Sequence, residues 1–269
     1  MFGYKIVEKS RDTIESVVNA AITEQRPLEV GLYFNDPQAW ELLHSRLPGA
    51  GIPINTHINH NRVGVFSLSE RETELRQQIA QAQSIGSSYS ITHLHKMPVP
   101  RRAVFRDSLA AYLTQQLQVL ERVCSELDHP LYVENTFHGL EVYRWFFDLV
   151  ERLELRYVHH CFDLGHAKLW SEESLPEWLQ WLEALTEKGF KLHFHLHANN
   201  GLWDQHLAFT EVLAQGLDAA DAYTPEWDYF AVLAQLRDRF PLSRKVFEVK
   251  PQQALANMAL VQERLRAIG

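Results

Sequence analysis

Five short stretches of this chain run apolar for a few residues and then end on imidazole or carboxylate side chains. They are 90–95 (SITHLH), 131–135 (LYVEN), 161–166 (CFDLGH), 193–197 (HFHLH) and 246–250 (VFEVK). Side chains two apart on a strand share a face, so His93 and His95 point the same way and Leu94 points the other way. Imidazole nitrogens and carboxylate oxygens bind divalent metal ions, so together they predict a metal site.

These stretches belong to a chain in which strand and helix patterns alternate about eight times. Strands are expected over 4–7, 28–34, 52–58, 88–95, 131–137, 157–163, 191–197 and 245–249. Helices are expected over 13–23, from 35 onward, 70–85, 107–127, 140–153, 174–188, 227–240 and 251–269. Alternation implies parallel strands, and about eight units favour a single (β/α)8 TIM barrel of the α/β class over a doubly wound sheet. The C-terminal ends of the strands meet at one rim of such a barrel, where we expect the site.

Composition narrows the class of protein further. A length of 269 residues and a hydrophobic content of 46% suit one barrel domain spanning residues 1–269. The net charge of −8 disfavours a nucleic-acid partner, because phosphate contacts need clustered Lys and Arg. The two cysteines, Cys124 and Cys161, provide neither a disulfide framework nor a thiolate zinc pattern. No apolar run reaches the length of a signal peptide or membrane span, so we expect a cytoplasmic protein, and seven tryptophans leave room for a homodimer.

Read in order, five motifs resemble the xylose-isomerase-like TIM barrel superfamily. They are VEN at 133–135, FDLGHA at 162–167, HLHANNG at 195–201, DQH at 204–206 and FE at 247–248. That superfamily contains sugar phosphate isomerases and epimerases together with nucleases of the endonuclease IV type (AP endonuclease family 2). The resemblance runs from the expected third strand to the end of the chain, and the order of the motifs is more specific than any one of them.

In the epimerase branch, the resemblance implies one divalent ion (Mn, Mg, Co, Zn or Fe) held by two glutamates, an aspartate and a histidine. By motif these ligands are Glu134, Asp163, His195 and Glu248. The resemblance also casts Glu134 and Glu248 as catalytic base and acid, with His166 close to the substrate. The implied activity is isomerisation or epimerisation of a sugar or sugar-like hydroxy-carbonyl compound, through proton transfer by glutamate and a metal-stabilised enediolate.

In the nuclease branch, and in related multinuclear iron oxidases, further side chains hold a second and a third ion. The candidates here are His57, His60, His93, His166, Asp204 and His206, so one to three ions per chain remain open. Glu134 would then bridge two metals. The segment from His195 to Asp204 is shorter than in the nucleases and the chain is acidic, so we rank an endonuclease IV-like phosphodiesterase below an isomerase.

Simpler interpretations stand beside these. The strand carboxylates could form salt bridges with Lys or Arg inside the barrel, because an unpaired buried charge is costly. His195 could be a hydrogen-bonded core histidine, and Asp204 could belong to an ordinary polar loop. A sugar-binding protein built on a barrel without activity is the non-enzymatic alternative. Four further residues are candidates for substrate binding: His95, His197, Lys250 and Trp203.

Overall fold

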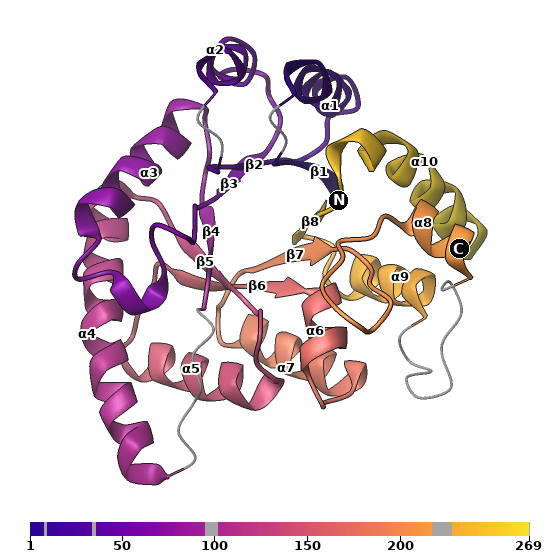
Figure 1. Cartoon of the computed structure of the whole chain (residues 1–269). Helices are drawn as coiled ribbons and strands as arrows, with labels where there is room; N and C mark the ends of the chain where they lie inside the picture. The colour runs from indigo at the N-terminus through magenta and orange to yellow at the C-terminus, as the bar shows by residue number, and fades with distance from the viewer. Residues whose placement is uncertain (8–9, 34–35, 95–101, 217–227, 269) are drawn as a thin grey trace.

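The computed structural model describes residues 1–7, 10–33, 36–94, 102–216 and 228–268. Its strands form a closed barrel in which β1 to β8 follow one another in sequence order and every neighbouring pair is parallel (Figure 1). They are β1 Phe2–Ile6, β2 Leu28–Gly31, β3 Ile54–His57, β4 Ser90–His93, β5 Leu131–Glu134, β6 Val158–Asp163, β7 Leu192–Leu196 and β8 Arg244–Phe247. This arrangement confirms the predicted (β/α)8 TIM barrel.

Helices surround the strands as an outer ring (Figure 1). They are α1 Arg11–Thr23, α2 Pro37–Arg46, α3 Glu72–Ser84, α4 Ala103–Leu127, α5 Leu140–Arg152, α6 Leu164–Trp170, α7 Leu175–Glu187, α8 Phe209–Gln215, α9 Tyr229–Arg239 and α10 Pro251–Ile268, with a short 3-10 turn η1 at Val65–Ser67. The helices expected from the sequence are present with small shifts at their ends, whereas α6 and α8 were not expected. No helix within the described ranges is long and apolar enough to span a membrane.

Seven of the eight strands end one to three residues earlier than the sequence predicted, whereas β6 ends at the expected residue. The expected ends were residues 7, 34, 58, 95, 137, 197 and 249, and the observed ends are Ile6, Gly31, His57, His93, Glu134, Leu196 and Phe247. Several site side chains lie on the last residue of a strand or just after it: His57, His93, Glu134 and Asp163 each end a strand, and Glu248 follows β8.

Two long loops were also expected, after the fourth and the seventh strands. The first was expected over 96–104, but α4 already begins at Ala103, and 95–101 lie outside the described residues. The second was expected over 199–225, but α8 occupies part of it, and 217–227 lie outside the described residues.

The two faces of the strands are chemically different. The outward face packs apolar rings against the helices: Phe162 of β6 lies 5.2 Å from the fully buried Trp178 of α7, and Phe194 of β7 lies 5.2 Å from Phe240. The inward face carries polar side chains, with His193 and His195 of β7 both fully buried. Because successive side chains on a strand alternate, the apolar outer face directs the polar residues into the barrel.

Candidate metal centre

Glu134, Asp163, His195 and Glu248 converge at the C-terminal rim of the barrel. They come from β5, β6, β7 and the residue after β8, and one ligand atom from each lies within 4.8 Å of the others. The His195 Nδ1 atom lies 2.8 Å from Glu248 Oε2, 3.1 Å from Glu134 Oε2 and 3.9 Å from Asp163 Oδ2. The four residues that the resemblance implied as ligands therefore lie together at the rim of the barrel.

Three buried atoms in this group have no hydrogen-bond partner among the described residues: Asp163 Oδ2, His195 Nδ1 and Glu248 Oε2. Buried polar atoms are normally paired, so three unpaired acceptors facing one point need an explanation. A divalent cation supplies one, because carboxylate oxygens and a neutral imidazole nitrogen are its usual donors. The residues present therefore fit a metal ion.

The orientation of Asp163 follows from its place at the start of α6. Its Oδ1 accepts a hydrogen bond from the His166 backbone N–H at 2.7 Å, which caps the helix. Asn135 holds the Asp163 backbone on both sides: its Oδ1 accepts from the Asp163 N–H at 2.7 Å and its Nδ2 donates to the Asp163 carbonyl at 2.9 Å. With Oδ1 used by the cap, Oδ2 remains for a ligand.

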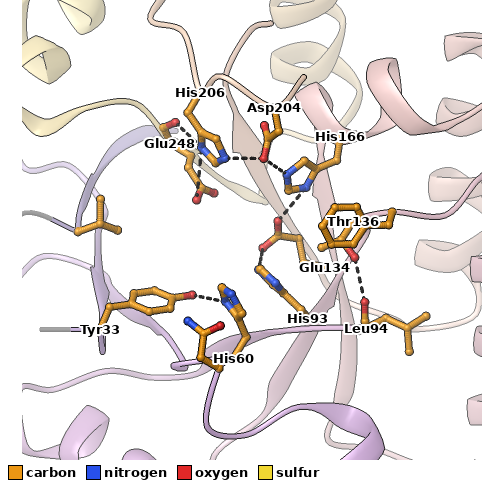
Figure 2. Close-up of a pocket in the computed structure, with 13 residues that line it drawn as sticks. Tyr33, His60, His93, Leu94, Glu134, Thr136, His166, Asp204, His206 and Glu248 are labelled. Carbon is orange, nitrogen blue, oxygen red and sulfur yellow. Dashed lines mark hydrogen bonds and ion pairs between the residues drawn. The ribbon is translucent and has the colours of Figure 1, made fainter. Parts of the chain in front are cut away.

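A second group of donors consists of the β3–β4 histidines His57, His60 and His93. Figure 2 shows His60 and His93 on one side of Glu134. The Glu134 Oε2 atom is 3.1 Å from His57 Nε2 and 3.3 Å from His93 Nε2. The His60 and His93 rings stack at 4.0 Å. The hydroxyl of Tyr33 lies 2.6 Å from His57 Nδ1 and 2.9 Å from His60 Nδ1, a contact that the sequence did not predict.

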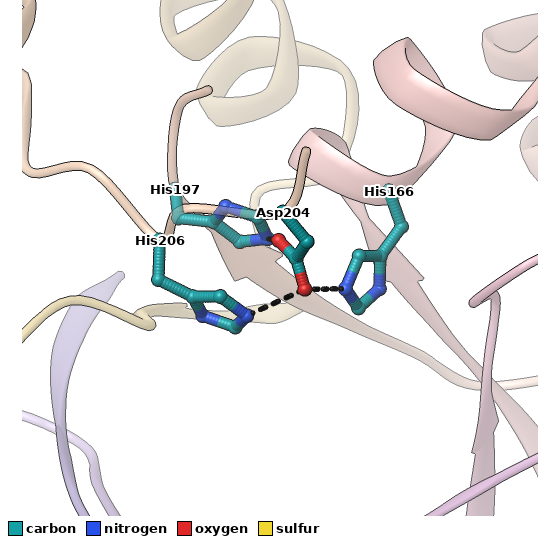
Figure 3. Close-up of side chains that lie close together, drawn as sticks. All are labelled: His166, His197, Asp204 and His206. Atoms are coloured by element: carbon teal, nitrogen blue, oxygen red, sulfur yellow. Dashed lines mark hydrogen bonds and ion pairs between the residues drawn. The ribbon is translucent and has the colours of Figure 1, made fainter. Parts of the chain in front are cut away.

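A third group lies on the other side, and Figure 3 shows its members, His166, His197, Asp204 and His206. Asp204 Oδ2 accepts from His166 Nε2 at 3.0 Å and from His206 Nε2 at 2.9 Å. His197 Nε2 lies 3.0 Å from Asp163 Oδ1, and its ring stacks on that of His206 at 4.1 Å. Asp204 and His206 therefore contact other predicted site residues.

Glu134 and Glu248 stay ionised although they are buried. Burial raises the pKa of Glu134, but the charges of His93 and His195 outweigh it and hold that pKa well below its usual value. Burial likewise raises the pKa of Glu248, and the Lys5 ammonium holds it well below the usual value. The rim therefore concentrates negative charge, which attracts cations.

A cavity of about 690 Å³ opens above these groups (Figure 2). This volume suits a small metabolite. Its lining includes seven of the predicted site residues: His60, His93, Glu134, His166, Asp204, His206 and Glu248. Apolar side chains of Val7, Leu94 and Phe137 complete part of the wall.

The four residues predicted to bind substrate have different outcomes. His197 is fully buried beside Asp163, so it supports the donor groups from below and does not face the cavity. Trp203 is 57% exposed and Lys250 is also exposed, and neither is among the described residues that line the cavity. His95 lies outside the described residues.

Two buried charged residues were missed, Lys5 of β1 and Glu29 of β2. Lys5 Nζ lies 3.1 Å from Glu29 Oε1 and 2.6 Å from Glu248 Oε1. The salt bridge considered as a simpler interpretation is thus present for Glu248, but it occupies Oε1 and leaves Oε2 free. The available signal was a single charge within an apolar strand, which on its own does not reveal a partner.

Comparisons with solved structures identify the fold. No protein-family model and no curated protein sequence matches this chain. A protein of Thermus thermophilus, from a crystal soaked with ZnCl2, superimposes with a TM-score of 0.66 at 19% identity, covering 98% of this chain and 97% of that one. A D-tagatose 3-epimerase-like protein gives 0.68 at 17% identity, covering 99% and 97%. The chain therefore shares the TIM barrel fold of these structures.

An enzyme from E. coli, 3-keto-D-glucoside 4-epimerase, shares this fold with a TM-score of 0.62 at 15% identity, covering 97% of this chain and 98% of that one. Identities in this range show a common architecture and leave the reaction of this chain to be argued from its own site.

Proposed function

We propose that this chain is a divalent-metal-dependent isomerase or epimerase of a sugar or sugar-like hydroxy-carbonyl compound. The observation that carries the proposal is the convergence of Glu134, Asp163, His195 and Glu248 on one point, with unpaired donor atoms facing it. A cavity of about 690 Å³ above them has room for a sugar. Solved structures of this fold that bear the names of sugar epimerases are consistent with that chemistry.

The same four residues would hold the ion, and their oxygen and nitrogen donors accept Mn, Mg, Co, Zn or Fe. When bound, the ion would supply positive charge for substrate oxygens that become negative as a proton leaves the neighbouring carbon. Lys5 already neutralises part of the Glu248 charge, and His166 contacts Glu134.

Proton transfer is assigned to Glu134 and Glu248, which enter the site from two different sides of the barrel mouth (Figure 2). One of the two would remove the proton beside the carbonyl as a carboxylate, and the other, protonated when the substrate is bound, would deliver a proton to the opposite face of the same carbon. Each is held by a second contact: His166 Nδ1 lies 3.1 Å from Glu134 Oε1, and Lys5 Nζ lies 2.6 Å from Glu248 Oε1. Fixed orientation of the two groups is what stereochemical inversion requires.

Solvent isotope exchange tests this function. Incubation with ketoses and ketose phosphates in D2O, with Mn²⁺ or Co²⁺ added, should place solvent deuterium at the carbon beside the carbonyl of at least one compound, as read by NMR. Glu134→Gln and Glu248→Gln should each abolish the exchange. The exposed Glu187→Gln provides a matched control that should retain it. Absence of exchange across the whole panel would contradict the proposal.

A second candidate is a two- or three-metal hydrolase or oxidase, and the β3–β4 histidines and the group around Asp204 favour it. The oxygens of Glu134 contact members of both groups, as expected for a bridging carboxylate. The charges of the site favour the same candidate. Glu134, Asp163 and Glu248 bring three carboxylates and Lys5 brings one ammonium group, so more than one cation could be accommodated.

Metal counting separates the two candidates. Elemental analysis of protein purified without chelator should give about one ion per chain for the isomerase and two or three for the multinuclear enzyme. Bound iron with a visible absorption band would favour the oxidase.

A further inference from the structure

Lys5 and Glu29 form a fully buried ion pair inside the barrel, directly behind the predicted ligands. Their side chains are 1% and 0% exposed, and Nζ lies 3.1 Å from Oε1. Removing two charges from water costs several kcal/mol per ion unless further contacts repay it. Well-packed apolar residues fill this space at no such cost, so the pair requires an explanation beyond packing.

Glu29 contacts Nε2 of His195, the ring nitrogen that points away from the other predicted ligands. Its Oε1 and Oε2 lie 3.0 and 3.1 Å from His195 Nε2. Asn55 Nδ2 donates to Glu29 Oε2 at 2.6 Å, which fixes the carboxylate. An ionised carboxylate only accepts hydrogen bonds, so a proton of His195 resides on Nε2, and Nδ1 is the nitrogen that can offer a lone pair to a metal ion. Nδ1 is the nitrogen that faces Glu134 and Glu248.

Lys5 acts in the same way on Glu248. Its ammonium contacts Oε1 at 2.6 Å, while Oε2 has no hydrogen-bond partner among the described residues and lies 2.8 Å from His195 Nδ1. The Glu248 backbone N–H donates to the Leu196 carbonyl at 3.1 Å, so the main chain is fixed as well. Oε1 of Glu248 is thus engaged by Lys5, and Oε2 faces the point where the other predicted ligands meet.

We propose that Lys5 and Glu29 are positioning residues that set which atom of Glu248 and which nitrogen of His195 a divalent ion meets. The pair connects β1 and β2, which carry none of the predicted ligands, to two ligands near the opposite end of the sequence. This inference rests on the metal centre of the proposed function and is independent of the reaction that the centre performs.

Cobalt titration of Glu29→Gln provides the first test. The amide keeps the size of the side chain but removes its charge, so the affinity for Co²⁺, followed by its visible absorption, should fall about 10- to 100-fold. Ser90→Ala is the matched control. It removes buried hydrogen bonds to Thr56 and His129 but contacts no residue predicted to bind the metal, so it should leave the affinity for Co²⁺ within about twofold of the wild type.

The imidazole tautomer provides a second readout that a merely structural role would not move. In ¹⁵N-histidine-labelled, metal-free protein, His195 should be protonated at Nε2, and Glu29→Gln should raise the share protonated at Nδ1. His195→Asn identifies the signal. Unchanged tautomer and unchanged Co²⁺ affinity in Glu29→Gln would overturn the inference.

Lys5→Met leaves two buried carboxylates without their cation and can fail to fold. The double variant Lys5→Met/Glu29→Gln removes one charge of each sign, so it should recover a cooperative thermal transition while still binding Co²⁺ at least about 10-fold more weakly than the wild type. Wild-type affinity in the double variant would overturn the inference. A wild-type protein that binds no Co²⁺ would overturn the metal centre itself, and the inference with it.

Discussion

Glu134 connects the three donor groups at the level of single side chains. Its Oε2 lies within 3.1 to 3.3 Å of His57, His93 and His195, and its Oε1 lies 3.1 Å from His166. A carboxylate with two oxygens is suited to this arrangement because each oxygen can face a different partner. Removing Glu134 would therefore disturb every part of the site. Variants of the two aspartates, Asp163 and Asp204, distinguish the three donor groups better.

Asp163→Asn and Asp204→Asn are a matched pair for this purpose. Asp163 offers an unpaired oxygen to the central group, so its amide variant should bind Co²⁺ about 100-fold more weakly or worse, beyond what residues behind a ligand typically cause. Asp204 contacts the outer imidazoles His166 and His206, so Asp204→Asn should keep tight binding of one ion. Titration with Co²⁺ checks both. Equal losses in the two variants would show that the groups do not act separately.

How far single residues could be predicted depended on whether a local motif contained them. Glu134, Asp163 and His195 stand in recognisable motifs at strand ends, and the structure brings them together. Glu29 stands alone in an apolar strand, and its partner His195 lies 166 residues away. No spacing along the chain carries that contact, because it arises only when the barrel closes.

Helix α6 carries His166 and begins directly at the end of β6. Its second residue is Gly165, and a Cβ atom there would lie 2.1 Å from His197 Cε1. The ring of His197 cannot withdraw easily, since it is fully buried and stacked on His206. Glycine at this position therefore allows the helix to approach β7 closely.

Gly165→Ala should consequently destabilise the protein. Overpacking of a buried contact costs about 1–3 kcal/mol, so the free energy of unfolding in urea should fall by that amount. Gly165→Ala combined with His197→Ala removes both partners of the clash and should show a coupling energy of at least about 1 kcal/mol. Additive effects of the two substitutions would indicate that the ring and the new methyl group do not meet.

Helix α6 also shows why some elements escaped prediction. Helix α6 and helix α8 have 7 residues each, fewer than the roughly 11-residue window over which a 3.6-residue period becomes visible. The longer α4 and α7 show that period and were predicted. The predicted strands ran too far for a related reason. Leu94 and Val249 continue the alternation of polar and apolar residues beyond the last residues of β4 and β8, so the pattern alone does not show where each strand ends.

On the scale of the whole molecule, the two halves of the chain make different contributions to the site: the second half supplies the predicted central ligands, and the first half supplies residues behind them. The five motifs that carry the family resemblance begin in β5, and β5 to β8 deliver the central donors. Strands β1 and β2 carry no such motif, yet they supply Lys5 and Glu29 behind those donors. Closure of β8 onto β1 is what brings the two halves into contact.

Histidines buried away from the site make the stability of the whole fold depend on pH. His129 is 1% exposed, and its Nε2 lies 2.8 Å from Ser90 Oγ. Burial lowers the pKa of His129 to about 4, although Asp128 opposes the shift. Burial also lowers the pKa of His159 to about 4 and that of His160 to about 3. In the unfolded chain an imidazole has a pKa of about 6.5.

The unfolded chain therefore binds more protons than the folded one as soon as the pH falls below about 6.5. The free energy of unfolding should decrease from there; the contributions of His129 and His159 level off below about pH 4 and that of His160 below about pH 3, where both states are protonated. For His129 alone the loss is about 2 kcal/mol near pH 5, from about 1.4 kcal/mol per pH unit. Urea unfolding near pH 7.5 and pH 5, in chelator to exclude bound metal, measures it. His129→Gln keeps a partner for Ser90 without a titrating ring, so it should lose about 2 kcal/mol less than the wild type; equal losses in both proteins would contradict the assignment.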